Sequence, residues 1–229
     1  MTWEEIKRRL DLGLSDASHL SSLLRSDDFW ESDERVVFRT ASYLYEHQRP
    51  QECLRLADAI NEHSFIMSRK AEVGMHYLRG DALHDLKLFS EAIAAYNRLL
   101  QIEESDIAFG NRALAQWELG NFEKALRDYL NAVKLNPLNA VALRGAGEML
   151  NRLDRPAEAV QHLTAAIKLD PKYSAAYTAL GVAYYNSKEW LKSYQALKRA
   201  LELDPEDSIA AKGLRKIETH FELDKAGLH

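Results

Sequence analysis

The sequence has few of the features that mark secreted or membrane proteins. Cys53 is the only cysteine among 229 residues, so no disulfide can form within the chain, and the cytoplasm is the expected location. No apolar run approaches the roughly 20 residues that a membrane-spanning helix needs. The first residues, MTWEEIKRRLDLG, lack the basic start and apolar centre of a secretory signal peptide.

A strong charge of one sign is also absent. The formal net charge is −5, whereas nucleic-acid-binding proteins present a basic surface, so a nucleic-acid partner is not expected. Apolar residues make up 46% of the chain and charged residues 28%, which is typical of a soluble folded protein.

Motifs of catalysis are missing as well. The sequence has no Gly-x-Ser-x-Gly elbow and no Ser-x-x-Lys pair. Gly145 and Gly147 form a Gly-x-Gly, but a third glycine and a preceding strand are lacking, so a dinucleotide site is not expected. Cys53 occupies a position for small buried residues, which predicts an inert thiol. We therefore expect no enzyme, no catalytic residue and no cofactor.

One stretch leaves a metal site open. His76, Asp81, His84 and Asp85 lie on consecutive turns of one predicted helix and could in principle meet a metal ion. Their directions spread around that helix, which favours a solvated or groove-lining role instead. No metal site is expected, and a metal-dependent hydrolase using residues 76–85 remains the alternative.

What the sequence does contain is a repeat of 34 residues. The segment ALRDYLNAVKLNP at 125–137 returns as AVQHLTAAIKLDP at 159–171 and as SYQALKRALELDP at 193–205. Each copy has an apolar helical pattern that ends in proline. A fixed period of this length predicts stacked copies of one helical hairpin.

The pattern of large and small residues resembles the tetratricopeptide repeat (TPR) family. The unit that starts at Asp106 places Phe109, Ala113, Phe122, Ala125, Tyr129, Ala132 and Pro137 in the family's conserved positions, with Gln116 as a departure. Five units are assigned on this basis, at about 34–67, 73–105, 106–139, 140–173 and 174–207. The resemblance implies an all-α, right-handed superhelical solenoid of antiparallel helix pairs.

Segments of other character flank the repeats. Residues 1–33 are expected to form a degenerate helical pair, at 2–12 and 16–25, with a capping box between Thr2 and Glu5, followed by a polar-aromatic connector. Residues 206–229 are expected to form a capping helix and tail that cover the last apolar surface.

About five extra residues separate the first two repeat units. They fall in the segment 61–72, which either extends the following helix backwards or forms a longer turn. Phe65, Ile66 and Met67 then either pack on the preceding pair or form a partner-facing patch or hinge.

The resemblance also implies where a partner binds, because the first helices of TPR units line a concave face. Six residues are predicted to contact a protein or peptide partner there: Tyr45, Tyr77, Asn111, Trp117, Arg144 and Arg152. Aromatic and arginine side chains often anchor interfaces. The alternatives are that Trp117 packs along the inner face, and that Arg144 and Arg152 are solvated, with local pairing to Glu148.

The predicted function is a non-enzymatic interaction module or adaptor. The carboxylate clamp that some TPR modules use to hold chaperone tails is absent, because the residues flanking Asn111 do not match it. The alternative is a self-associating scaffold, a homo-oligomer formed through exposed Trp3, Phe29 and Trp30.

Overall fold

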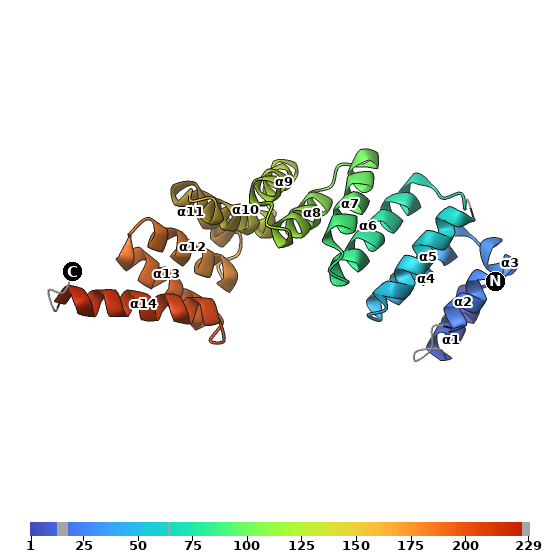
Figure 1. Ribbon diagram of the computed structural model, residues 1–229, viewed down its shortest axis with the longest axis horizontal. Helices are drawn as coiled ribbons and strands as arrows, with labels where there is room; N and C mark the ends of the chain where they lie inside the picture. Colours follow the sequence, from blue (N-terminus) through green and yellow to red (C-terminus); the bar gives the residue numbers. More distant parts are fainter. Residues whose placement is uncertain (13–17, 64, 226–229) are drawn as a thin grey trace. The chain divides into compact units, whose positions relative to one another are not determined.

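The computed structural model describes residues 1–12, 18–63 and 65–225, and within these ranges all regular secondary structure is α-helical (Figure 1). The all-α prediction is therefore confirmed. The first eight helices are α1 (Trp3–Leu12), α2 (Ser18–Leu24), α3 (Asp27–Trp30), α4 (Glu34–Glu46), α5 (Pro50–Glu62), α6 (Arg69–Asp85), α7 (Phe89–Ile102) and α8 (Asp106–Glu118). The remaining six are α9 (Phe122–Leu135), α10 (Ala140–Arg152), α11 (Pro156–Leu169), α12 (Ser174–Asn186), α13 (Trp190–Leu203) and α14 (Ser208–Lys225).

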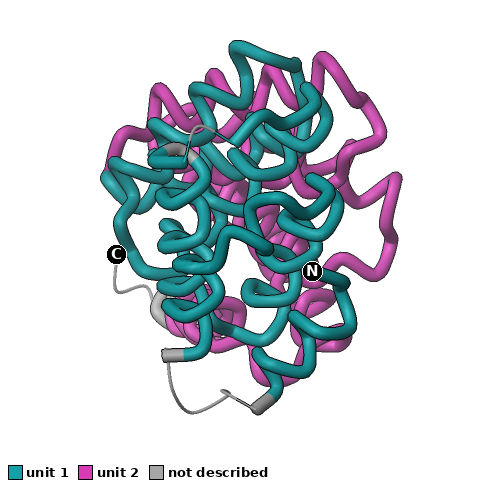
Figure 2. The backbone as a smooth tube through the Cα atoms, turned by 90° about the vertical axis from the view of Figure 1, so that its right-hand side faces the viewer, with its two compact units in different colours: residues 1–119 teal, residues 120–229 magenta. Residues whose placement is uncertain are grey.

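The chain divides into two compact units, which are described separately (Figure 2). The N-terminal unit comprises Met1–Leu119, and the C-terminal unit comprises Gly120–His229. In the N-terminal unit α4 packs on α5, α6 packs on α7, and the first helices α4, α6 and α8 adjoin in order. In the C-terminal unit α10 packs on α11, α12 packs on α13, and α10, α12 and α14 adjoin in order. We call the faces formed by these two series of helices the first-helix surfaces.

The N-terminal pair folds as expected at its start and differs at its end. Thr2 and Glu5 form the predicted reciprocal capping box, because each side chain accepts a hydrogen bond from the other's backbone N–H, at 2.8 and 3.4 Å. The connector, however, contains the short helix α3. Phe29 is fully buried in it, and Trp30 donates a hydrogen bond of 3.0 Å to the Leu24 carbonyl. The prediction that Phe29 is exposed is therefore wrong: its ring lies in the core of the N-terminal unit. Residues 16 and 17 of the predicted second helix, and 226–229 of the predicted tail, lie outside the described residues.

Small residues allow the helices of a pair to approach closely. A Cβ atom on Gly147 would lie 2.5 Å from Cγ of Leu163, and one on Gly181 would lie 2.5 Å from Cγ of Leu197. Such distances are impossible for real side chains, so α10 and α11, and likewise α12 and α13, pack as they do because glycine stands there. The interpretation of Gly147 as a packing residue is confirmed.

The turns inside the hairpins share a backbone feature that the sequence did not reveal. Gln48, Lys87, Gly120, Asp154 and Lys188 all have positive φ, between 55° and 74°. Each stands two residues before a second helix. Left-handed backbone at this point ends the first helix and turns the chain into the second. Only Gly120 adopts this conformation without a steric cost.

Prolines also stand where helices begin and end. Pro50 and Pro156 are the first residues of α5 and α11, where a missing N–H leaves no hydrogen bond unmade. Pro137, Pro171 and Pro205 each follow a second helix by two residues and prevent its continuation.

The irregular segment extends the following helix backwards, which was one of the two expected shapes. Helix α6 begins at Arg69, four residues before the expected unit boundary, and residues 65–68 before it have no regular secondary structure. Phe65 and Met67 pack against the core of the N-terminal unit, whereas Ile66 is 91% exposed.

Helix α14 has the register of the first helix of a sixth repeat, since Ser208 follows Ser174 by one period. Where α12 carries Gly181 and Tyr184, α14 carries the exposed residues Arg215 and Glu218. A polar outer face of this kind is what a terminal helix of a solenoid requires.

Candidate functional site

A hydrogen-bonded cluster around Asp81 occupies the first-helix surface of the N-terminal unit. The Asn111 amide, on α8, donates to Oδ1 of Asp81 at 2.9 Å and to the Tyr77 hydroxyl at 3.2 Å. The Tyr96 hydroxyl, on α7, donates to the same Asp81 oxygen at 2.6 Å. One carboxylate thus joins the helices α6, α7 and α8. The hydrogen bonds hold the side chains of Tyr77, Tyr96 and Asn111 in place around it. We call Tyr77, Asp81, Tyr96 and Asn111 the Asp81 cluster.

Local sequence explains how the cluster forms. Tyr77 and Asp81 are four residues apart on α6 and so lie on one face of that helix. Gly80 clears the path for Tyr96, because a Cβ atom there would lie 2.4 Å from the Tyr96 ring. The ring can therefore pack closely against α6 at Gly80 and extend its hydroxyl to Asp81.

The cluster is electrostatically unusual because the carboxylate is largely shielded from water. Burial raises the pKa of Asp81 above its ordinary range, and the hydrogen bonds from Tyr96 and Asn111 oppose that shift only in part. Burial also raises the pKa of Tyr77 and of Tyr96, and the negative charge of Asp81 adds to both shifts. Both hydroxyls therefore keep their protons at neutral pH: that of Tyr96 donates to Asp81, and that of Tyr77 accepts from Asn111.

Tyr45 adjoins the cluster from α4. Burial raises the pKa of Tyr45 above its ordinary range, with further contributions from Asp81 and Asp85. Its ring is half-buried, as is that of Tyr77. Three of the six predicted contact residues, Tyr45, Tyr77 and Asn111, are thus brought together on one surface.

Trp117 lies on α8, six residues beyond Asn111 and in the last turn of the helix. Its side chain is half-buried. An indole at this exposure presents both apolar area and an N–H donor at the surface.

The two predicted arginines belong to the C-terminal unit and have different environments. Arg144 is half-buried, donates a hydrogen bond of 2.7 Å from Nε to the Tyr173 hydroxyl, and pairs with Glu148. Burial opposes its charge, but Glu148 and Tyr173 outweigh burial and raise the pKa of Arg144. Arg152 is exposed, with its guanidinium carbon 5.9 Å from the centroid of the Phe122 ring.

Two of the central groups escaped the sequence-based prediction. Asp81 was expected to have a solvated or groove-lining role and was not among the six contact residues, and Tyr96 was not among them either. The spacing of Tyr77 and Asp81 on one helix face was the available signal for Asp81. Nothing in the spacing indicated that a core tyrosine on α7 would extend its hydroxyl to the same carboxylate.

Several features bear on the alternative functions. Within the described residues, no group of three or more His, Cys, Asp or Glu side chains is arranged to hold a metal ion. Cys53 is fully buried, and burial raises the pKa of its thiol to about 12. Among the described helices, none is long and apolar enough to cross a membrane.

Solved structures of TPR proteins share this fold. YrrB, a TPR protein with an unusual peptide-binding site, is 20% identical, with a TM-score of 0.67 over 80% of this chain and 92% of YrrB. MamA 41-end from Desulfovibrio magneticus RS-1 is 17% identical, with a TM-score of 0.66 over 77% of this chain and 98% of that one. The first TPR of Spaghetti (RPAP3), bound to the HSP90 peptide SRMEEVD, is 23% identical, with a TM-score of 0.50 over 52% and 94%.

No curated protein matches the sequence. The tetratricopeptide repeat pattern itself matches residues 38–107 and 111–174, and a second tetratricopeptide repeat pattern matches residues 150–217. The two segments matched by the first pattern together span more than half of the chain. The protein therefore belongs to the tetratricopeptide repeat family.

Proposed function

We propose that this protein is a non-enzymatic interaction module, an adaptor that binds a peptide, a helix or a partner domain on its first-helix surfaces in the cytoplasm. The observation that carries the proposal is the Asp81 cluster. Hydrogen bonds fix Tyr77 and Asn111 at a partly exposed surface before any ligand arrives. Side chains that are already ordered lose little entropy on binding, which favours affinity.

The solved relatives support a peptide as ligand. Spaghetti holds an HSP90 peptide, and YrrB has a peptide-binding site, on the same kind of scaffold. In this chain we assign anchoring to Tyr45, Tyr77 and Trp117, because half-buried aromatic rings give large contact areas.

Polar contacts are assigned to Asn111 in the N-terminal unit and to Arg144 and Arg152 in the C-terminal unit. The Asn111 amide uses its N–H groups within the cluster, so its oxygen is left to accept a hydrogen bond from a ligand. A guanidinium has five N–H donors, so Arg144 retains donors beyond those given to Tyr173 and Glu148.

Quantitative capture from a lysate of the source organism tests the proposal. Immobilised wild-type protein is compared with Trp117→Ala, Arg144→Ala and the double variant, and bound proteins are measured by mass spectrometry. A control variant, Leu130→Ala with Leu191→Ala, removes exposed apolar side chains from the second helices α9 and α13. The proposal is supported if the double variant loses one set of proteins that the control variant still captures. Capture that survives in the double variant contradicts it.

A self-associating scaffold is the second candidate, although the exposed residues that would form its interface differ from those expected. Phe29 is buried, and Trp3 and Trp30 pack against the core, but Ile66 is 91% exposed between two core-contacting residues. Sedimentation velocity over a wide concentration range tests this function. A monomer at all concentrations excludes it, and a dimer that Ile66→Ser dissociates supports it.

A further inference from the structure

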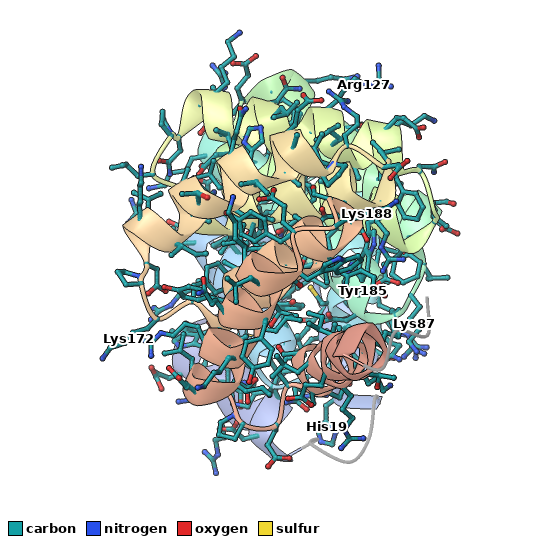
Figure 3. The ribbon with its side chains drawn as sticks, turned by 90° about the vertical axis from the view of Figure 1, so that its left-hand side faces the viewer. His19, Lys87, Arg127, Lys172, Tyr185 and Lys188 are labelled. Carbon is teal, nitrogen blue, oxygen red and sulfur yellow. The ribbon has the colours of Figure 1, made fainter. Side chains whose placement is uncertain are left out.

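A cavity lies in the C-terminal unit, and none of the six residues predicted to contact a partner lines it. It has a volume of about 350 Å³, is lined by residues of α12, α13 and α14, and opens to solvent. Its wall and floor are Val182, Tyr185, Leu197 and Ile209, and its remaining residues are Asn186, Lys212, Gly213 and Lys216. Figure 3 labels Tyr185, with α14 seen nearly end-on below it. We call this cavity the α12–α14 pocket.

The shape of the pocket is built into the fold. The Tyr185 ring packs edge-on against Trp190, with centroids 5.2 Å apart, which fixes the wall on the α12 side. Leu197, 1% exposed, closes the floor. A Cβ atom on Gly213 would lie 2.7 Å from Cδ1 of Leu197, so the glycine lets α14 approach the floor.

The apolar part of the pocket is open to solvent. Ile209, on its lip, is 62% exposed. The volume of the pocket is at the lower end of the roughly 300–1,000 Å³ range of ligand pockets and leaves room for one apolar side chain. Filling it would remove Ile209 and the ring of Tyr185 from water, which favours binding.

The rim of the α12–α14 pocket is positively charged, and none of the described residues that line the pocket is acidic. Lys212 and Lys216 are exposed and stand four residues apart on α14, so they project from one face of the helix, with Cα atoms about 6 Å apart along the axis. Like charges at this spacing disfavour the helix. Among the described side chains, no carboxylate forms an ion pair with either lysine. An acidic ligand would relieve this repulsion.

We propose that the α12–α14 pocket binds a peptide segment of another protein in which an apolar side chain is flanked by carboxylates. The apolar side chain enters between Tyr185 and Ile209, and the carboxylates pair with Lys212 and Lys216. The exposed Asn186 amide, with both a donor and an acceptor, is placed to hydrogen-bond the peptide backbone. The inference rests on the proposed interaction function and specifies a partner chemistry for it.

Fluorescence anisotropy with a labelled peptide, GSEDLEDSG, tests the proposal on the 229-residue chain. A peptide with alanine in place of leucine should bind about tenfold more weakly, because it lacks the apolar side chain. A peptide with lysine in place of the four acidic residues should show no binding. Equal affinity for the three peptides would overturn the proposal.

Variants locate the binding site. Lys212→Glu with Lys216→Glu should weaken binding of GSEDLEDSG at least about tenfold, since two attractive contacts become repulsive. Lys168→Glu with Lys172→Glu makes the same change in net charge at exposed residues outside the pocket, and should leave the affinity within about twofold. Ile209→Ser should weaken binding, whereas Leu191→Ser, at an equally exposed leucine on α13, should not. Equal effects of the two members of either pair would overturn the assignment.

Two further outcomes separate other occupants from the proposed one. A dimer in sedimentation that Lys212→Glu with Lys216→Glu dissociates would identify a second copy as the occupant and overturn the proposal. Displacement of the peptide by a 12-nucleotide single-stranded RNA would assign the lysines to phosphate instead. If lysate capture still depends on Trp117 while GSEDLEDSG fails to bind, this inference fails and the proposed function stands.

Discussion

The Tyr96 hydroxyl donates a hydrogen bond of 2.6 Å to the Asp81 carboxylate, and this bond joins the second helix α7 to the first-helix surface of the N-terminal unit. A residue that packs in the core thus also fixes a group at the surface. Gly80 makes the bond possible, because any side chain there would collide with the Tyr96 ring. Packing and the candidate site depend on the same residues.

The pH dependence of stability should report on this carboxylate. Burial raises the pKa of Asp81, so the folded protein holds the proton more tightly than the unfolded chain does. The resulting stabilisation is present below the unfolded pKa of about 3.9 and is lost as the pH rises through the folded pKa. Asp81→Asn does not titrate, so its stability relative to wild type should increase as the pH rises from 4 to 7.

Urea unfolding at several pH values measures that difference. Asp28→Asn, at an exposed aspartate, is the control for the loss of one surface carboxylate. A relative stability of Asp81→Asn that stays flat, or that declines with rising pH, would contradict the account of Asp81.

The thiol of Cys53 should be inert in the folded protein. It is fully buried, and its pKa of about 12 leaves almost no thiolate at pH 8. Reaction with Ellman's reagent should be slow in buffer and immediate in 6 M guanidinium chloride. Rapid labelling of the native protein would mean that α5 opens readily or that the thiol is accessible.

Close packing of the helix pairs gives a matched pair of glycine substitutions. Gly147→Ala forces a methyl group to within 2.5 Å of Leu163 and should lower the free energy of unfolding by about 1–3 kcal/mol. Gly110→Ala, also in a helix, meets no heavy atom within 4 Å and should raise it by up to about 1 kcal/mol, through helix propensity. Chemical denaturation checks both, and equal destabilisation by the two variants would contradict the packing account.

The left-handed turn residues predict changes of opposite sign. Lys188 has φ of 59°, and Lys188→Gly should stabilise the protein by about 0.5–1 kcal/mol, because the relief of strain exceeds the added entropy of the unfolded chain. Gly120 has φ of 74°, and Gly120→Ala should cost about 1 kcal/mol. Thermal unfolding of both variants provides the measurement. A stabilised Gly120→Ala would show that this turn is not held in the left-handed conformation.

Much of the fold could be predicted from the sequence because the repeat determines it locally. Gly147, Gly181 and the prolines at 137, 171 and 205 recur at one period, and their roles follow from steric size and from the missing N–H. Phe29 was misjudged because it lies outside the repeat. In a short polar segment no periodicity shows which side of a new helix is buried.

The candidate site was less predictable, because it depends on which side chains meet across helices. Tyr77 and Asn111 are 34 residues apart, one full period, and their positions on successive first helices indicated a shared surface. The contribution of Tyr96 depends on how its ring crosses Gly80, and that of Tyr173 on reaching Arg144 from the residue just before α12. Neither of these two contacts between helices can be predicted from sequence spacing alone.

Site-specific photo-crosslinking tests the central claim most directly, namely that the partner binds on the first-helix surfaces. A benzophenone amino acid is placed at Tyr45 or Trp117 on first helices and, as controls, at Leu130 or Leu191 on second helices. Irradiation in lysate should give discrete crosslinked products from the first-helix positions and none from the controls. Crosslinks confined to the second-helix positions would contradict the account.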